Sequence, residues 1–166
     1  MENSIILLVL SMTVIFSSCE QKAPDNSKEN VALVESFVGA VEAMDHNAME
    51  SFLAENYVGL GPSYGDSTNK AQAVENWKYN SDNLYEKIQY NKSRSIAVVV
   101  PDGDNKGEWV SNWAELQITY KNRGGKVTIL ANSVYQVEDG KIVKSFTFYN
   151  EADALRQLGY SFVAPY

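Results

Sequence analysis

The chain has 166 residues, which suffices for one domain with its own apolar core. It carries 14 Lys and Arg against 21 Asp and Glu, a net charge of -7, and the basic residues form no cluster. Because a phosphate backbone is held by clustered Lys and Arg, this composition opposes nucleic-acid binding. The single Cys19 and the single His46 exclude an intrachain disulfide and the paired-ligand zinc motifs, so we predict no metal site and no cofactor.

The N-terminus has the pattern of a lipoprotein export signal. Residues 5–16 (IILLVLSMTVIF) form an apolar run that is shorter than the roughly 20 residues of a membrane-spanning helix but typical of a signal peptide. The following Phe16-Ser17-Ser18-Cys19 resembles the lipobox of bacterial lipoproteins, in which the cysteine is acylated and becomes the new N-terminus. This resemblance implies cleavage before Cys19 and a lipid-anchored protein of the cell envelope.

We therefore divide the chain into a signal peptide over residues 1–18, a solvated tether over 19–28 and one domain over 29–166. The alternative is a buried N-terminal helix with an incidental cysteine. The polar segment EQKAPDNSK after Cys19 favours the tether. The first four residues contain Glu2 and no Lys or Arg, so only the α-amino group supplies the positive end of the signal.

The first part of the domain is predicted to be mainly helical. Apolar residues recur at helical spacing over residues 27–44, and Asn47 to Glu50 matches a capping box that opens a short second helix. A short strand over 57–60 and a turn-rich loop over 61–66 then lead to a third helix over about 69–80.

From Leu84 onward the apolar period changes to two, which predicts strands joined by Gly-containing hairpin turns. The stretch from Tyr79 to Tyr90 is polar at its centre and is interpreted as a solvated entry to the sheet. The predicted fold class is α+β, with a curved antiparallel sheet, three N-terminal helices and a short C-terminal helix. The four strands cover about 84–100, 108–120, 126–137 and 141–149, and the last helix covers 151–158.

Two C-terminal segments carry a family resemblance. Val137 to Val143 (VEDGKIV), followed by Leu155 to Gly159 (LRQLG), resembles the SnoaL-like polyketide cyclase branch of the nuclear transport factor 2-like superfamily, and the element order is similar over residues 28–160. The resemblance implies a cone with an apolar pocket at its wide end. Members use this pocket for isomerisation, cyclisation, dehydration, epoxide opening or binding alone, so the fold does not determine the function.

The resemblance also places the family's catalytic positions on this sequence. Ketosteroid isomerases need a base carboxylate and two acidic hydrogen-bond donors, and these positions hold Gly61, Phe37 and Ser133. Polyketide cyclases place a carboxylate on the last strand, where this chain has Thr147. Each position lacks the expected group, which favours binding without the known catalysis.

Strand alternation provides the ligand-binding candidates. If residues 138–140 form a three-residue turn, Ser133 and Tyr135 should face the same way as Ser145, Thr147 and Tyr149. The family order adds two aromatic residues near the mouth of the pocket, Tyr57 and Trp77.

The side of the sheet occupied by Trp113 stays open at the level of sequence. With one hairpin parity, Trp113 also lines the pocket, and Glu115 beside it becomes the candidate catalytic base, with a pKa raised by burial. With the opposite parity, Trp109 and Trp113 lie outside with Phe146 and Phe148 and form an apolar convex face suited to a homodimer.

Three hypotheses follow for the function. The first is an envelope protein that binds a small apolar or aromatic molecule without the family's catalytic set. The second is an isomerase, lyase or cyclase that pairs Glu115 with Tyr57 or Tyr149. The third is a homodimeric interaction module.

Overall fold

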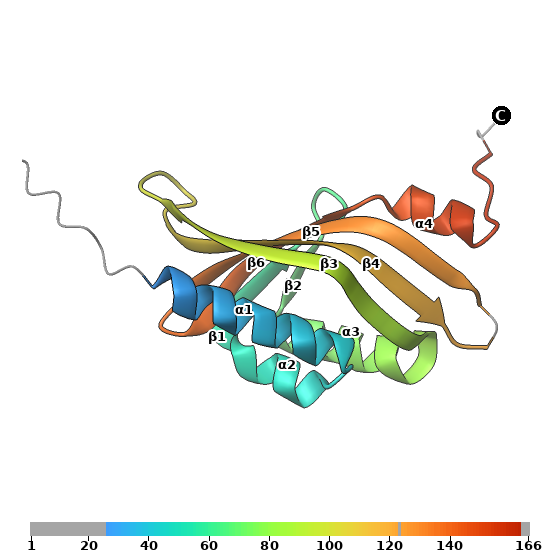
Figure 1. The fold of residues 1–166 in the computed structure, drawn as a ribbon, viewed down its shortest axis with the longest axis horizontal. Helices are drawn as coiled ribbons and strands as arrows, with labels where there is room; N and C mark the ends of the chain where they lie inside the picture. Colours follow the sequence, from blue (N-terminus) through green and yellow to red (C-terminus); the bar gives the residue numbers. More distant parts are fainter. Residues whose placement is uncertain (1–25, 123, 164–166) are drawn as a thin grey trace, which may run out of the picture.

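The computed structural model describes residues 26–122 and 124–163, and within them helices pack against one curved six-stranded sheet (Figure 1). The predicted signal peptide, Cys19 and most of the tether lie outside the described residues. In chain order the elements are α1 (Ser27–Glu42), α2 (His46–Phe52), β1 (Leu53–Leu60), β2 (Ser67–Asn69), α3 (Lys70–Tyr79), the π-helix η1 (Asn80–Leu84), β3 (Tyr85–Val100), β4 (Gly107–Tyr120), β5 (Lys126–Glu138), β6 (Lys141–Tyr149) and α4 (Glu151–Gln157).

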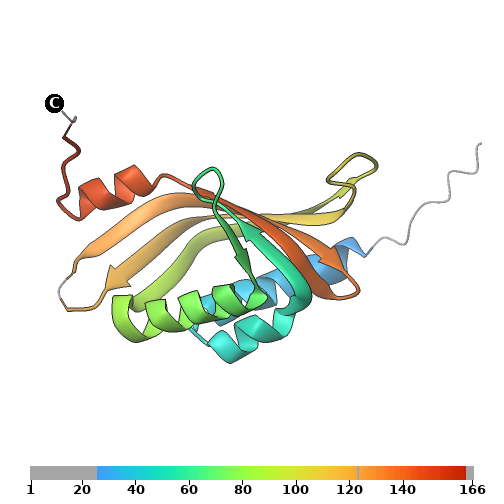
Figure 2. The ribbon, with the colours of Figure 1, turned by 180° about the vertical axis from the view of Figure 1, so that it is seen from behind.

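The sheet has the order β2-β1-β6-β5-β4-β3. Strands β3 to β6 form the predicted antiparallel meander, whereas β1 pairs with β6 in parallel, so the sheet is mixed. Helices α1, α2 and α3 lie together on one side of the sheet, and α4 lies apart from them near the far end of β5 (Figures 1 and 2). None of the helices among the described residues is long and apolar enough to cross a membrane.

The helix boundaries depend on local capping. Helix α2 begins at His46, because the carboxylate of Asp45 accepts a hydrogen bond of 3.0 Å from the backbone N–H of Ala48. The predicted capping box at Asn47 is therefore wrong, since Asn47 already lies inside the helix. A reciprocal capping box instead opens α3, where Asn69 caps the helix and Gln72 bonds back to the Asn69 N–H.

The turn between β5 and β6 differs from the predicted three-residue turn. It contains two residues, Asp139 and Gly140, both with positive φ, and a two-residue turn alone would invert the faces of β6. A register shift next to the turn leaves Val143 without a partner on β5 and restores the parity. Ser133 consequently lies directly opposite Thr147, on the same face of the sheet as predicted.

The core lies on the concave face of the sheet in two groups. The larger group joins α1, α2 and α3 to the sheet around Val34, Phe37 and Ile142. The smaller group joins α4 to β4 and β5 through Ala154, Ile118 and other apolar side chains. The helices of the two groups cover different parts of one face, and a hollow lies between them.

Candidate ligand-binding site

Two adjoining compartments form the hollow in the concave face. The first, which we call the β1 compartment, has a volume of about 380 Å3 and extends from α1 and α3 to the end of β1. The second, the α4 compartment, has a volume of about 270 Å3 and lies between β3, β4, β5 and α4. The compartments share part of their lining, namely Val41, Trp77, Asn80, Tyr90 and Tyr149.

The β1 compartment brings together most of the side chains that the sequence suggested as ligand contacts. Tyr57 comes from β1 and Trp77 from α3, while the others come from neighbouring strands β5 and β6. Their contact with a ligand remains a prediction. The predicted residues in this lining are Tyr57, Trp77, Ser133, Tyr135, Thr147 and Tyr149.

Hydrogen bonds between neighbouring strands join four of the hydroxyls in this compartment. The hydroxyl of Tyr57 shares a 2.7 Å hydrogen bond with Ser145, and Ser133 and Thr147 are 3.2 Å apart. Burial raises the pKa of Tyr57 and raises that of Tyr135 further. These phenols are therefore neutral at physiological pH, so they can donate hydrogen bonds but cannot serve as bases.

The four positions that the resemblance assigns to the family's catalytic groups also converge here. Phe37, Gly61, Ser133 and Thr147 all line the β1 compartment, so the resemblance placed them in one site. Phe37 packs its ring 5.5 Å from that of Tyr135. Gly61 has a φ of 92°, and a Cβ there would overlap the carbonyl oxygen of Thr147. The position aligned with the isomerase base therefore has a backbone that disfavours any side chain.

The register of β4 resolves the parity that the sequence left open. Trp113 lies opposite Asn132, which lies opposite Phe148, and all three side chains are on the convex face. Trp113 is 45% exposed and Phe148 is 54% exposed. Trp109 shares this face but is buried, because it stacks on Phe146 at a ring distance of 5.8 Å.

Glu115 lies on the convex face as well. Its carboxylate forms a 2.6 Å ion pair with Lys92, and it lines an outer groove together with Trp113. Tyr57 lines the compartment on the opposite face of the sheet. The sheet therefore separates the two members of the proposed Glu115–Tyr57 pair.

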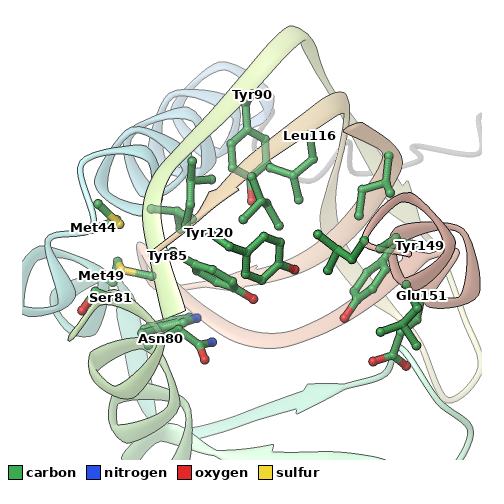
Figure 3. Close-up of a pocket in the computed structure, with 18 residues that line it drawn as sticks. Met44, Met49, Asn80, Ser81, Tyr85, Tyr90, Leu116, Tyr120, Tyr149 and Glu151 are labelled. Carbon is green, nitrogen blue, oxygen red and sulfur yellow. The ribbon is translucent and has the colours of Figure 1, made fainter. Parts of the chain in front are cut away.

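The α4 compartment contains functional candidates that the sequence did not reveal. Tyr85, Tyr120 and Tyr149 line it together with Glu151 (Figure 3). The predicted solvated entry to the sheet is wrong for Tyr85 and Tyr90, which are both partly buried and line the hollow. One pattern in the sequence could have indicated this compartment. Leu116, Ile118 and Tyr120 recur every two residues, which is typical of side chains on one face of a strand.

Burial also raises the pKa of the phenols in this compartment. The pKa of Tyr85 rises to about 12, first through burial and then through neighbouring phenols and the Glu151 carboxylate. Burial and the same carboxylate raise the pKa of Tyr120 and Tyr149. In the described part of the chain, no group of three His, Cys, Asp or Glu residues is arranged to hold a metal ion.

Comparisons with known proteins identify the fold. Neither a protein-family sequence model nor a curated protein sequence matches the chain. A candidate polyketide cyclase from Xanthomonas campestris superposes with a TM-score of 0.65 at 18% identity, over 80% of this chain and 98% of that one. A nuclear transport factor 2-like protein from Burkholderia xenovorans gives 0.60 at 16% identity, over 80% and 97%. The chain has the nuclear transport factor 2-like fold.

A third similar structure carries a ligand. This Catenulispora acidiphila protein has a ketosteroid isomerase-like fold and was solved in complex with trimethylamine; it superposes with a TM-score of 0.61 at 14% identity, over 78% of this chain and 93% of that one. The predicted resemblance is confirmed for the fold. At these identities a shared fold does not transfer an activity.

Proposed function

We propose that this chain is a lipid-anchored protein of the bacterial cell envelope, whose nuclear transport factor 2-like domain binds a small apolar or aromatic molecule without the family's isomerase or cyclase chemistry. The observation that carries the proposal is the lining of the β1 compartment. Phe37, Gly61, Ser133 and Thr147, the positions that the resemblance assigns to the family's catalytic groups, all lie in that lining, which contains no carboxylate and no imidazole.

The size and polarity of the hollow support binding of a small ligand. Ligand pockets typically measure about 300–1,000 Å3, are mostly apolar and contain a few oriented polar groups. The two compartments, of about 380 and about 270 Å3, combine aromatic and aliphatic walls with phenol and hydroxyl groups. The complex of the Catenulispora protein with trimethylamine is a precedent for a small ligand bound to this fold.

The ligand proposal is tested by native mass spectrometry of the full chain after incubation with an envelope metabolite extract. We expect the wild type to retain a small molecule. The variant Val41→Trp adds bulk at a position that lines both compartments and should lose it. Leu130→Trp places a tryptophan on the convex face, where Leu130 is 78% exposed, and should retain it. A folded wild type that retains nothing contradicts the proposal.

The envelope address is tested separately by metabolic labelling with a radioactive fatty acid. We expect labelled wild type and unlabelled Cys19→Ala, because the lipobox resemblance makes Cys19 the acylated residue. Two acyl chains would give stable anchoring where one gives only marginal binding. Equal labelling of both proteins would refute the anchor.

A second function is favoured by the convex face. Large apolar side chains are exposed there on adjacent strands, including Ile96, Val98, Trp113, Leu130 and Phe148. Monomeric proteins rarely expose a large contiguous apolar patch, so this face suits a homodimer. Light scattering should show a dimer for the wild type and a monomer for Leu130→Glu. A monomeric wild type at high concentration would rule this function out.

A further inference from the structure

The hollow has one charged side chain in its described lining, and that side chain is acidic. Glu151 is exposed and lines both the α4 compartment and the outer groove, while the other residues of the two compartments are apolar or neutral polar. The ion pairs among the described residues join Lys70 to Glu55 and Lys92 to Glu115, so Glu151 has no cationic partner among them. A ligand can supply the missing positive charge.

Three phenol rings accompany this carboxylate. Tyr149 lies next to Glu151, and Tyr85 and Tyr120 extend across the pocket toward them (Figure 3). The rings of Tyr85 and Tyr120 meet edge to face at 5.4 Å, which leaves ring surface available to the cavity. The faces of aromatic rings attract cations through their negative quadrupole, as in the aromatic cages that bind quaternary ammonium groups.

The electrostatic interactions between Glu151 and the three phenols are consistent with a cation-binding arrangement. Besides burial, the Glu151 carboxylate raises the pKa of Tyr85, Tyr120 and Tyr149, so its field reaches all three phenols. Neutral phenols offer oxygen acceptors and ring faces to a cation. They offer no charge that could compensate an anionic ligand beside Glu151, and the net charge of -7 of the chain also disfavours an anion.

The remainder of the α4 compartment is apolar. Ile88, Leu116, Ile118 and Ile129 line it beyond the phenols. A ligand that satisfies both regions has a cationic head and an apolar or aromatic body. The volume of about 270 Å3 selects a small body, such as a single ring.

We propose that the α4 compartment binds an amphiphilic organic cation, with its ammonium group between Glu151 and the rings of Tyr85, Tyr120 and Tyr149 and its apolar body against β3, β4 and β5. This inference rests on the proposed binding function and names the chemical class of the ligand.

The test compares two probes of equal shape and different charge. Benzyltrimethylammonium carries the cation, and neopentylbenzene is its neutral carbon isostere. Binding of each to the full chain, held in lipid nanodiscs because detergent would compete for an apolar pocket, is measured by titration calorimetry at low ionic strength. We expect the cation to bind roughly tenfold more tightly, because cation–π and carboxylate contacts together contribute on the order of 1–2 kcal/mol.

Two charge-removing variants distinguish loss of the binding site from loss of the charge that stabilises the start of α4. Glu151 and Asp153 both lie in the first turn of α4, where a negative charge also stabilises the helix, but Asp153 does not line the compartment. Glu151→Gln should bring the two probes to nearly equal affinity, whereas Asp153→Asn should keep the preference for the cation. A preference that survives Glu151→Gln, or a neutral probe that binds as tightly as the cation to the wild type, overturns the inference.

The result also separates this inference from the proposed function. Binding of the neutral probe without a preference for the cation leaves the pocket protein intact and refutes only the cationic ligand. A wild type that binds neither probe refutes the cation site, and if it also retains nothing from the metabolite extract, the binding function fails with it.

Discussion

At the scale of single residues, Gly61 shows how the backbone limits the chemistry of the site. It directly follows β1 and has a φ of 92°, and its missing side chain makes room for the carbonyl of Thr147. Gly65, in the same loop, has the same φ of 92° but no neighbouring atom within reach of a Cβ. Substituting each glycine therefore distinguishes two destabilising effects of a side chain. At Gly65 only the positive φ is unfavourable, whereas at Gly61 steric overlap adds to it.

This comparison gives a stability prediction. Gly65→Ala should lower the free energy of unfolding by about 1–2 kcal/mol, which is the cost of a left-handed conformation for an L-residue. Gly61→Ala should lower it by at least about 1 kcal/mol more, because the new Cβ also displaces the Thr147 carbonyl. Urea denaturation measures both values, and equal losses would show that the backbone at Gly61 relaxes freely.

At the scale of elements, short polar side chains decide where helices begin. Asp45 caps α2 and Asn69 caps α3, each through a hydrogen bond to a backbone N–H three residues later. Asn47 has the residue type of a cap but lies within α2, where its side chain makes no capping bond. The second helix also supplies Met49 to the α4 compartment, so its start affects the wall of the site.

The caps give a second prediction. Asp45→Ala should reduce the free energy of unfolding by about 1 kcal/mol, because the N–H of Ala48 loses its acceptor. Asn47→Ala serves as the control and should change stability by less than about 0.5 kcal/mol, as is usual for a surface substitution. Thermal or urea unfolding measures both effects. A larger loss for Asn47→Ala than for Asp45→Ala would show that Asn47 is the N-cap of α2.

At the scale of the whole molecule, the hollow collects tyrosines whose pKa values are raised mainly by burial. The pKa of Tyr85 and that of Tyr90 rise to about 12 from an ordinary value near 10. The unfolded chain therefore releases these protons at lower pH than the folded chain does. Since the unfolded state then binds fewer protons, stability is fully present below pH 10 and falls as the pH rises from about 10 toward 12.

The third prediction concerns this alkaline window. Between about pH 10 and 12, each such tyrosine contributes a loss of up to about 1.4 kcal/mol per pH unit. Tyr90→Phe should make the decline in unfolding free energy shallower, whereas Tyr79→Phe, at a position that is 57% exposed, should leave the slope unchanged. Chemical denaturation at a series of pH values measures the slopes, and identical slopes for wild type and Tyr90→Phe would contradict the assignment.

Local patterns predicted most of the fold and much of the β1 compartment. Period-two alternation placed Ser133 and Tyr135 on one face with Thr147, because the side chains of a strand alternate strictly. The premise of a three-residue turn was wrong, yet the bulge at Val143 compensated for it. The parallel pairing of β1 with β6 was not predicted, since nothing local to β1 specifies a partner about 85 residues away.

The amino-acid sequence by itself determined the composition-level exclusions, the order of helices and strands, and which residue types occupy the family's catalytic positions, because these depend on local periodicity and residue identity. Only the tertiary structure decided that Trp113 and Glu115 face outward and that Glu151 lines the same compartment as Tyr85 and Tyr120. Those outcomes depend on strand register and on the docking of α4. A shift of one residue in register exchanges the two faces of a strand, and local sequence does not specify it.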